Sequence, residues 1–62
     1  MYKIQIEKVD GEVYFIKDGK AYEEEFAGEF MEYLWNVKGH TGEYASFRMI
    51  DEAGEVYAEL EC

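Results

Sequence analysis

The chain has 62 residues, 15 of them Asp or Glu and 6 of them Lys or Arg, so its formal net charge at pH 7 is -9. Such a field repels nucleic acid and membrane surfaces and attracts basic partners, so we expect neither direct nucleic-acid binding nor membrane binding. A chain of this length makes one small domain, residues 1–62. The excess of acid is confined to residues 21–62, because residues 1–20 carry equal numbers of the two signs.

Residues 2–9 alternate polar and apolar side chains, which predicts a half-buried strand. Asp10-Gly11 is a strong hairpin signal, and residues 12–17 are the expected second strand. A two-residue loop pairs Ile6 with Phe15, and opposed residues share a face of the sheet. The predicted core face holds Ile4, Ile6, Val13 and Phe15, and the predicted open face holds Gln5, Glu7, Tyr14 and Ile16.

Asp18-Gly19 is a second turn signal, after which residues 20–23 form either a short extra strand or a lead into a helix. The spacing of apolar residues predicts that helix over residues 23–37. Its predicted core stripe is Phe26, Phe30, Leu34 and Val37, with Ala27 and Met31 beside it. Gly39 stands where a helix C′ glycine belongs.

Residues 43–50 and 55–61 are expected to form a second hairpin around the turn at residues 51–54. With Ile50 opposite Glu55, one face is apolar and the other is polar. The apolar face comprises Ala45, Phe47, Met49, Val56, Ala58 and Leu60, and the polar face comprises Tyr44, Ser46, Arg48, Tyr57, Glu59 and Glu61. Two hairpins and one helix predict an α+β fold of ββαββ order, with a four-stranded sheet and the helix packed on one face.

The residues offer little catalytic chemistry. His40 is the one histidine and Cys62 the one cysteine, and no ligand spacing of a metal site is repeated. A cysteine at a fraying terminus is a poor nucleophile, and the acidic turn at residues 51–55 lacks the EF-hand pattern. We therefore expect a non-enzymatic protein without cofactor or metal. A lone cysteine suits a reducing compartment, so a cytoplasmic location is expected.

The candidate functional surface is acidic. Glu25, Glu29 and Glu32 recur at four- and three-residue steps, so they share one stripe of the predicted helix without an interleaved Lys or Arg. Like charges so spaced cost a few tenths of a kcal/mol per pair, which favours a use for the row over a merely solubilising surface. The predicted partner-binding set is Glu24, Glu25, Glu29, Glu32, Asp51, Glu52, Glu55 and Glu59.

In size, charge and lack of catalytic groups the chain resembles the small acidic inhibitors encoded by phages and mobile elements, among them anti-CRISPR and anti-restriction proteins that mimic DNA. The resemblance implies a non-enzymatic inhibitor that places carboxylates on the basic site of a DNA- or RNA-binding protein. It also implies action in the cytoplasm of the host cell.

The element order supports an alternative. It resembles the β-grasp layout of bacterial immunoglobulin-binding domains of the protein G and protein L type, with Gly42-Glu43-Tyr44 opening the second hairpin. That resemblance implies a protein-binding module, natural or designed, that acts through its open sheet face, where Tyr and Arg are typical anchors. The residues of this alternative surface are Tyr14, Ile16, Tyr44, Arg48 and Tyr57. The same face would serve a weak homodimer if the chain is not a monomer.

Overall fold

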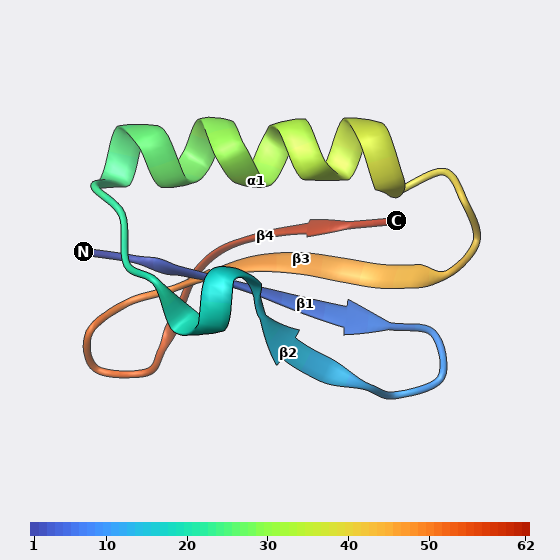
Figure 1. The fold of residues 1–62 in the computed structure, drawn as a ribbon, viewed down its shortest axis with the longest axis horizontal. Helices are drawn as coiled ribbons and strands as arrows, with labels where there is room; N and C mark the ends of the chain where they lie inside the picture. Colours follow the sequence, from blue (N-terminus) through green and yellow to red (C-terminus); the bar gives the residue numbers. More distant parts are fainter.

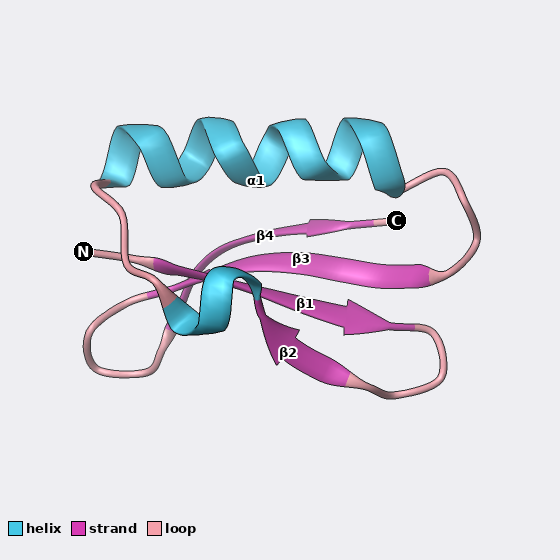
Figure 2. Cartoon of the chain, in the orientation of Figure 1, coloured by secondary structure: helices cyan, strands magenta, loops and turns pink.

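The computed structural model describes residues 1–62 as a four-stranded antiparallel sheet with one long helix along one side (Figure 1). In chain order the elements are β1 (Lys3–Lys8), β2 (Val13–Phe15), the 3-10 helix η1 (Ile16–Gly19), α1 (Glu24–Lys38), β3 (Tyr44–Ile50) and β4 (Val56–Glu61). The predicted α+β class and ββαββ order are thereby confirmed (Figure 2). No helix in the structure is long and apolar enough to cross a membrane.

The strands lie in the order β2-β1-β3-β4, so β1 and β3 form the centre of the sheet. Both β2 and β3 run antiparallel to β1, and α1 therefore connects two parallel strands that have β1 between them. This is a split β-α-β arrangement. A β-grasp sheet instead places its first and last strands side by side and parallel at the centre. The resemblance to the protein G type thus holds for element order and not for sheet topology.

The first hairpin has a loop one residue longer than predicted. Gly11 donates its N–H to the Lys8 carbonyl at 3.0 Å and has a φ of 95°, the left-handed backbone that a three-residue hairpin loop requires at its last position. The register consequently pairs Ile6 with Tyr14 and not with Phe15. Because side chains alternate between the two faces, this slip of one residue turns every side chain of β2 over.

The predicted core positions of Val13 and Phe15 are therefore wrong. Both lie on the face away from α1 and are 49% and 37% exposed. Tyr14 and Ile16, predicted for the open face, pack against the core instead. The extra loop residue accounts for the corrections at Val13, Tyr14 and Phe15, whereas Ile16 already belongs to η1.

The second hairpin also departs from its predicted register, but its side chains keep their predicted faces of the sheet at the centre of the hairpin. The turn pairs Asp51, and not Ile50, with Glu55 through an N–H to carbonyl bond of 2.9 Å. A β-bulge next to Met49 then adds a second shift of one residue. Two such shifts restore the original facing, as the period of two requires.

The apolar face of this hairpin is consequently confirmed at its centre. Phe47 lies opposite Leu60 and Met49 opposite Ala58, and all four contribute to or pack against the core. Val56 precedes the bulge and is exposed, so its predicted place in the core is wrong.

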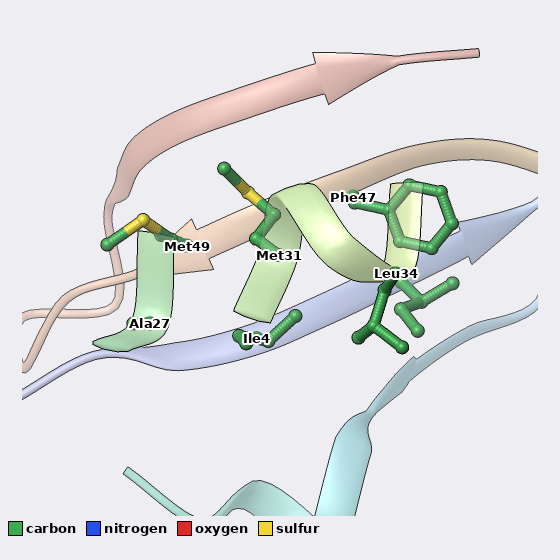
Figure 3. Close-up of a cluster of buried hydrophobic side chains, with 7 residues drawn as sticks. Ile4, Ala27, Met31, Leu34, Phe47 and Met49 are labelled. Carbon is green, nitrogen blue, oxygen red and sulfur yellow. The ribbon is translucent and has the colours of Figure 1, made fainter. Parts of the chain in front are cut away.

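Helix α1 packs on the sheet through Ala27, Met31 and Leu34, which repeat at four- and three-residue steps. These three meet Ile4 and Ile6 of β1 and Phe47 and Met49 of β3 (Figure 3). The predicted core stripe was centred on the side of the helix that bears Phe26 and Val37, because apolar residues cover a wide arc that includes both this side and the buried one. Phe26 and Val37, which belonged to that stripe, are 52% and 54% exposed.

Residues 20–23 lead into the helix and do not form a strand. Tyr22 makes a single bridge to Tyr2 through two backbone hydrogen bonds of 2.7 and 2.8 Å. Glu23 is the N-cap of α1 and makes no capping hydrogen bond with its side chain. At the other end Gly39 keeps a right-handed φ of -65°, so the predicted left-handed glycine cap is wrong, and the Thr41 hydroxyl donates to the last helical carbonyl at 3.0 Å.

Candidate functional site

The predicted acidic set divides into three parts of the structure. Glu24, Glu25, Glu29 and Glu32 lie exposed on α1. Asp51, Glu52 and Glu55 belong to the turn between β3 and β4, and Glu59 lies on the sheet face away from α1. Only the four glutamates of α1 share one continuous surface, which we call the acidic row.

The acidic row borders a cleft of about 720 Å³ between α1 and β4. Its apolar lining comes from Met31 of α1, Met49 of β3, and Ala58 and Leu60 of β4. Gly28 adds no side chain, and a Cβ there would come no closer than 4.0 Å to its nearest neighbour, the Met49 sulfur. The cleft therefore combines an apolar floor with an acidic rim.

Two hydrogen bonds join α1 to β4 at the ends of the cleft. The Tyr57 hydroxyl donates to Glu24 Oε2 at 2.7 Å, and this bond to a carboxylate raises the pKa of Tyr57 above its ordinary value. Trp35 Nε1–H donates to the Glu61 carbonyl at 2.9 Å. Tyr57 was predicted for the open sheet face, but it follows the β-bulge and reaches the helix.

The acidic row has no cationic partner in the molecule. Every ion pair uses another acid, and these acids are Glu7, Glu12, Glu52 and Glu59. Within the row only Glu24 accepts a hydrogen bond from another side chain, the Tyr57 hydroxyl. The charge of the row is consequently directed to solvent.

The acids of the β3–β4 turn are largely used by the chain itself. Asp51 Oδ1 accepts the backbone N–H groups of Ala53 and Glu55, both at 2.9 Å, so this carboxylate holds the turn. Glu52 pairs with the amino terminus of Met1 at 2.8 Å, and this hydrogen bond lowers the pKa of Glu52. Neither carboxylate is as free for a partner as those of the acidic row.

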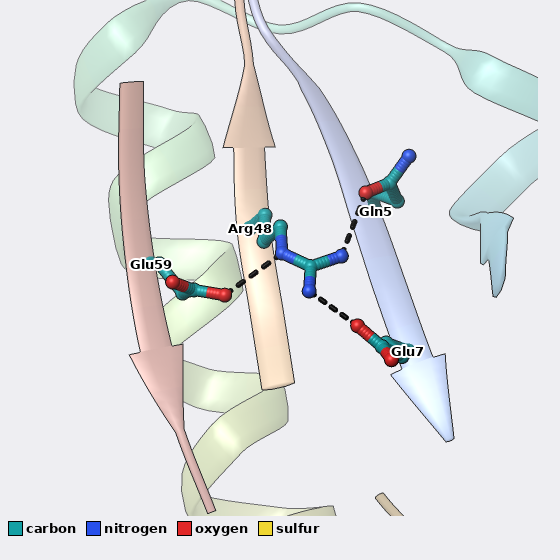
Figure 4. Close-up of polar contacts among 4 residues, drawn as sticks. All are labelled: Gln5, Glu7, Arg48 and Glu59. Carbon is teal, nitrogen blue, oxygen red and sulfur yellow. Dashed lines mark hydrogen bonds and ion pairs between the residues drawn. The ribbon is translucent and has the colours of Figure 1, made fainter. Parts of the chain in front are cut away.

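Glu59 belongs to a polar network on the open face of the sheet. Arg48 Nε donates to Glu59 Oε2 at 2.8 Å, Nη1 donates to Gln5 Oε1 at 3.0 Å, and Nη2 pairs with Glu7. Figure 4 shows these side chains in front of the sheet, with α1 behind it. The hydrogen bonds to Glu7 and then to Glu59 raise the pKa of Arg48 further above its ordinary value. Both carboxylates of the network are therefore paired within the molecule, although one cation serves the two of them.

The residues predicted for the alternative, sheet-face surface do not lie together on the open face of the sheet. Tyr14 is turned toward the core by the register of β2, and Ile16, the first residue of η1, also packs against the core. Tyr44 lies beneath the end of α1, with the Lys38 ammonium 5.9 Å from the centre of its ring. With Tyr57 drawn to the cleft, Arg48 alone remains on the open face.

The opposite flank of α1 is apolar and has no acidic member. Its residues, which we call the apolar flank, are Phe26, Phe30, Tyr33 and Val37. The Phe26 ring lies 5.7 Å from that of Phe30 and 5.0 Å from that of Tyr22. Tyr33 is 61% exposed, so this flank is only partly covered.

The cleft was not among the sites predicted from the sequence. Gly28 carried the available signal, because a glycine between Glu25 and Glu29 in a helix costs stability relative to Ala and leaves a gap on that side. Nowhere do three His, Cys, Asp or Glu side chains converge as they would to hold a metal ion. Comparison of the chain with known protein families, curated proteins and solved structures finds no match.

Proposed function

We propose that the chain is a non-enzymatic inhibitor that binds the basic, nucleic-acid-binding surface of another protein through the acidic row of α1. The observation that carries this proposal is that Glu24, Glu25, Glu29 and Glu32 lie together on one surface without a single cation among them. We include in the proposal an origin in a phage or mobile element and action in the cytoplasm of the host, as for the acidic inhibitors that the sequence resembles.

The spacing of the charges supports mimicry of a nucleic acid. From Glu24 to Glu32 the helix rises about 12 Å, at roughly 1.5 Å per residue. One strand of DNA carries a negative charge about every 3.4 Å, so a stretch of this length holds about four phosphates. The acidic row therefore offers Lys and Arg side chains nearly the charge density of one strand.

The contrast with the other acids supports the same proposal. Glu7 and Glu59 are both paired with Arg48, and Asp51 is held by backbone N–H groups. The row on α1 bears like-charge repulsion with no such compensation. A basic partner would supply the missing cations.

The alternative, a β-grasp module that binds through its sheet face, has lost the features on which it depended. The strand order differs from that layout, and four of its five anchors lie elsewhere. We therefore advance no second function.

The test begins with capture of partners from a bacterial lysate on the immobilised protein. Each captured protein is then loaded with labelled DNA or RNA, and the free chain is titrated in. We expect the chain to displace the nucleic acid. Its own binding to the captured protein should weaken as salt rises, because the screening length falls from about 10 Å at 0.1 M to about 3 Å at 1 M.

Two triple variants of equal net charge separate the acidic row from the overall charge. Glu25→Lys, Glu29→Lys and Glu32→Lys together should weaken displacement by about tenfold or more. Asp18→Lys, Glu43→Lys and Glu55→Lys together change the charge by the same amount away from the row and should weaken it much less. Equal losses in the two variants, or binding of the chain to its partner that does not weaken with salt, would contradict the proposal.

A further inference from the structure

The cleft between α1 and β4 indicates more about the partner than its charge. We infer that the cleft receives one apolar side chain from a basic segment of the partner, while Lys or Arg residues flanking that side chain pair with the acidic row. This inference rests on the proposed function and names the kind of segment that the inhibitor binds.

The floor of the cleft is built for an apolar group. Met31, Met49, Ala58 and Leu60 line it from three different elements, and Gly28 leaves the space above Met49 open. The volume of about 720 Å³ falls within the range of pockets that hold ligands. Methionine side chains adapt their shape to the group they meet, which suits a floor that receives a partner's side chain.

Two hydrogen bonds span α1 and β4 on either side of the residues that line the cleft. Tyr57 donates to Glu24, and Trp35 donates to the Glu61 carbonyl. Between Tyr57 and Glu61 the strand β4 extends only about 13 Å, at roughly 3.3 Å per residue. An opening this short suits a single side chain better than a helix or a strand of the partner.

Charge complementarity selects the segment that carries this side chain. All charged residues that line the cleft are glutamates. An acidic segment, a nucleic acid or a second copy of this chain, with its charge of -9, would be repelled there. Exposed ion pairs each contribute little, so the apolar group is expected to supply much of the affinity and the basic flanks its specificity.

The test uses two short synthetic peptides as probes, a run of lysines with one central leucine and the same peptide with serine in its place. Trp35, the only tryptophan, joins α1 to β4 beside the cleft, so its fluorescence is expected to report binding. We expect the leucine peptide to bind about tenfold more tightly than the serine peptide. Amide NMR shifts should change at Gly28, Ala58 and Leu60 with the leucine peptide only.

A matched pair of substitutions at one position gives the control. Gly28→Leu should fill the cleft and remove the difference between the two peptides. Gly28→Ala adds a methyl group that meets only ordinary contact and should keep the difference. Ala58→Leu fills the cleft from the other side and should repeat the effect of Gly28→Leu, which guards against a helix-specific change in folding.

The outcomes separate this inference from the function on which it rests. Equal affinity of the two peptides for the wild-type chain would overturn the inference, as would a difference that persists in both filled variants. The proposed function of the acidic row would still be supported if reversal of its charges abolished displacement of nucleic acid. Failure of that displacement assay would overturn the proposed function, whatever the peptides do.

Discussion

The two flanks of α1 are built from different chemistry although they share one helix and one buried ridge. Ala27, Met31 and Leu34 form the ridge, and they are the only buried residues of α1. Toward β4 the helix presents the acidic row above the cleft. On the opposite side it presents the apolar flank, with Phe26 and Val37 about half exposed.

This difference shows how little of the helix the fold itself requires. Burial against the sheet specifies the ridge, and a surface helix needs an apolar stripe of only about 100° to be held in place. The fold therefore does not specify the composition of either flank, and the two flanks differ. The acidic row carries charge that the molecule does not neutralise, whereas the apolar flank carries exposed area that needs no charge.

The largest expected effect comes from comparing the ridge with a flank. Leu34→Ala should lower the free energy of unfolding by about 2–3 kcal/mol, because it removes buried contacts and leaves a cavity. In a domain of this size that loss corresponds to a fall in melting temperature of about 10–20 °C. Val37→Ala should change stability by less than about 0.5 kcal/mol, since Val37 is exposed and Ala favours the helix. Thermal melts of the two variants measure this difference in stability. Similar losses in both variants would contradict the assignment of Leu34 to the buried ridge.

The next effect compares free carboxylates with paired ones. Arg48→Met removes the cation that Glu7 and Glu59 share and leaves the two acids facing each other on the open face. We expect a loss of about 2 kcal/mol, between the values for exposed and buried charge pairs. Glu29→Gln on the acidic row, where no partner is lost, should change stability by less than about 0.5 kcal/mol.

A double variant checks the cause of that loss. Glu59→Gln added to Arg48→Met removes one of the opposed charges and should recover part of the stability in a denaturant melt. Because the network lies on the opposite face from α1, displacement of nucleic acid by Arg48→Met should match the wild type at temperatures where both are folded. A loss of displacement with intact folding would place the functional surface on the open face.

Apolar periodicity was sufficient to predict the class, the element order and the helix. The helix was predicted over residues 23–37 and runs over Glu24–Lys38. The helical period of the apolar residues does not fix the centre of a wide apolar arc. The predicted core stripe was therefore centred on the side of Phe26, whereas the buried ridge runs through Ala27, Met31 and Leu34. The row of Glu25, Glu29 and Glu32 could be predicted because its spacing depends only on the helix itself.

The facing of β1 was predicted correctly, since Ile4 and Ile6 are buried, but the facing of the two hairpin partners depended on turn geometry. Asp10-Gly11 fits loops of two and of three residues, and the choice between them decides whether Tyr14 lies in the core or on the open face. In the second hairpin a different turn and a bulge offset each other. The cleft could not be predicted, because it depends on how far β4 lies from α1, and no local pattern encodes that distance.

The smallest expected effect concerns the bond that ties the acidic row to β4, which has no counterpart on the apolar flank. Tyr57 donates to Glu24, and its pKa is raised because a phenolate would lie against a carboxylate. Between the ordinary and the raised pKa the folded chain holds this proton more firmly than the unfolded chain does, so stability falls as pH rises. The contribution is complete below the ordinary value of about 10 and is lost above the raised one.

Tyr57→Phe isolates this contribution from the other groups that titrate in alkali. Two other groups titrate in this range. The pKa of Tyr14 is raised chiefly by burial, and the pKa of Lys8 is raised chiefly by Glu12. Their titration lowers the stability of the wild type and of the variant alike. The wild type should therefore be the more stable protein at about pH 8, and its advantage should shrink by about pH 11.5. Denaturant melts at the two pH values measure that advantage. A constant advantage would show that the hydroxyl does not bond to the carboxylate, and the acidic row would then be held to the sheet by the ridge and Trp35 alone.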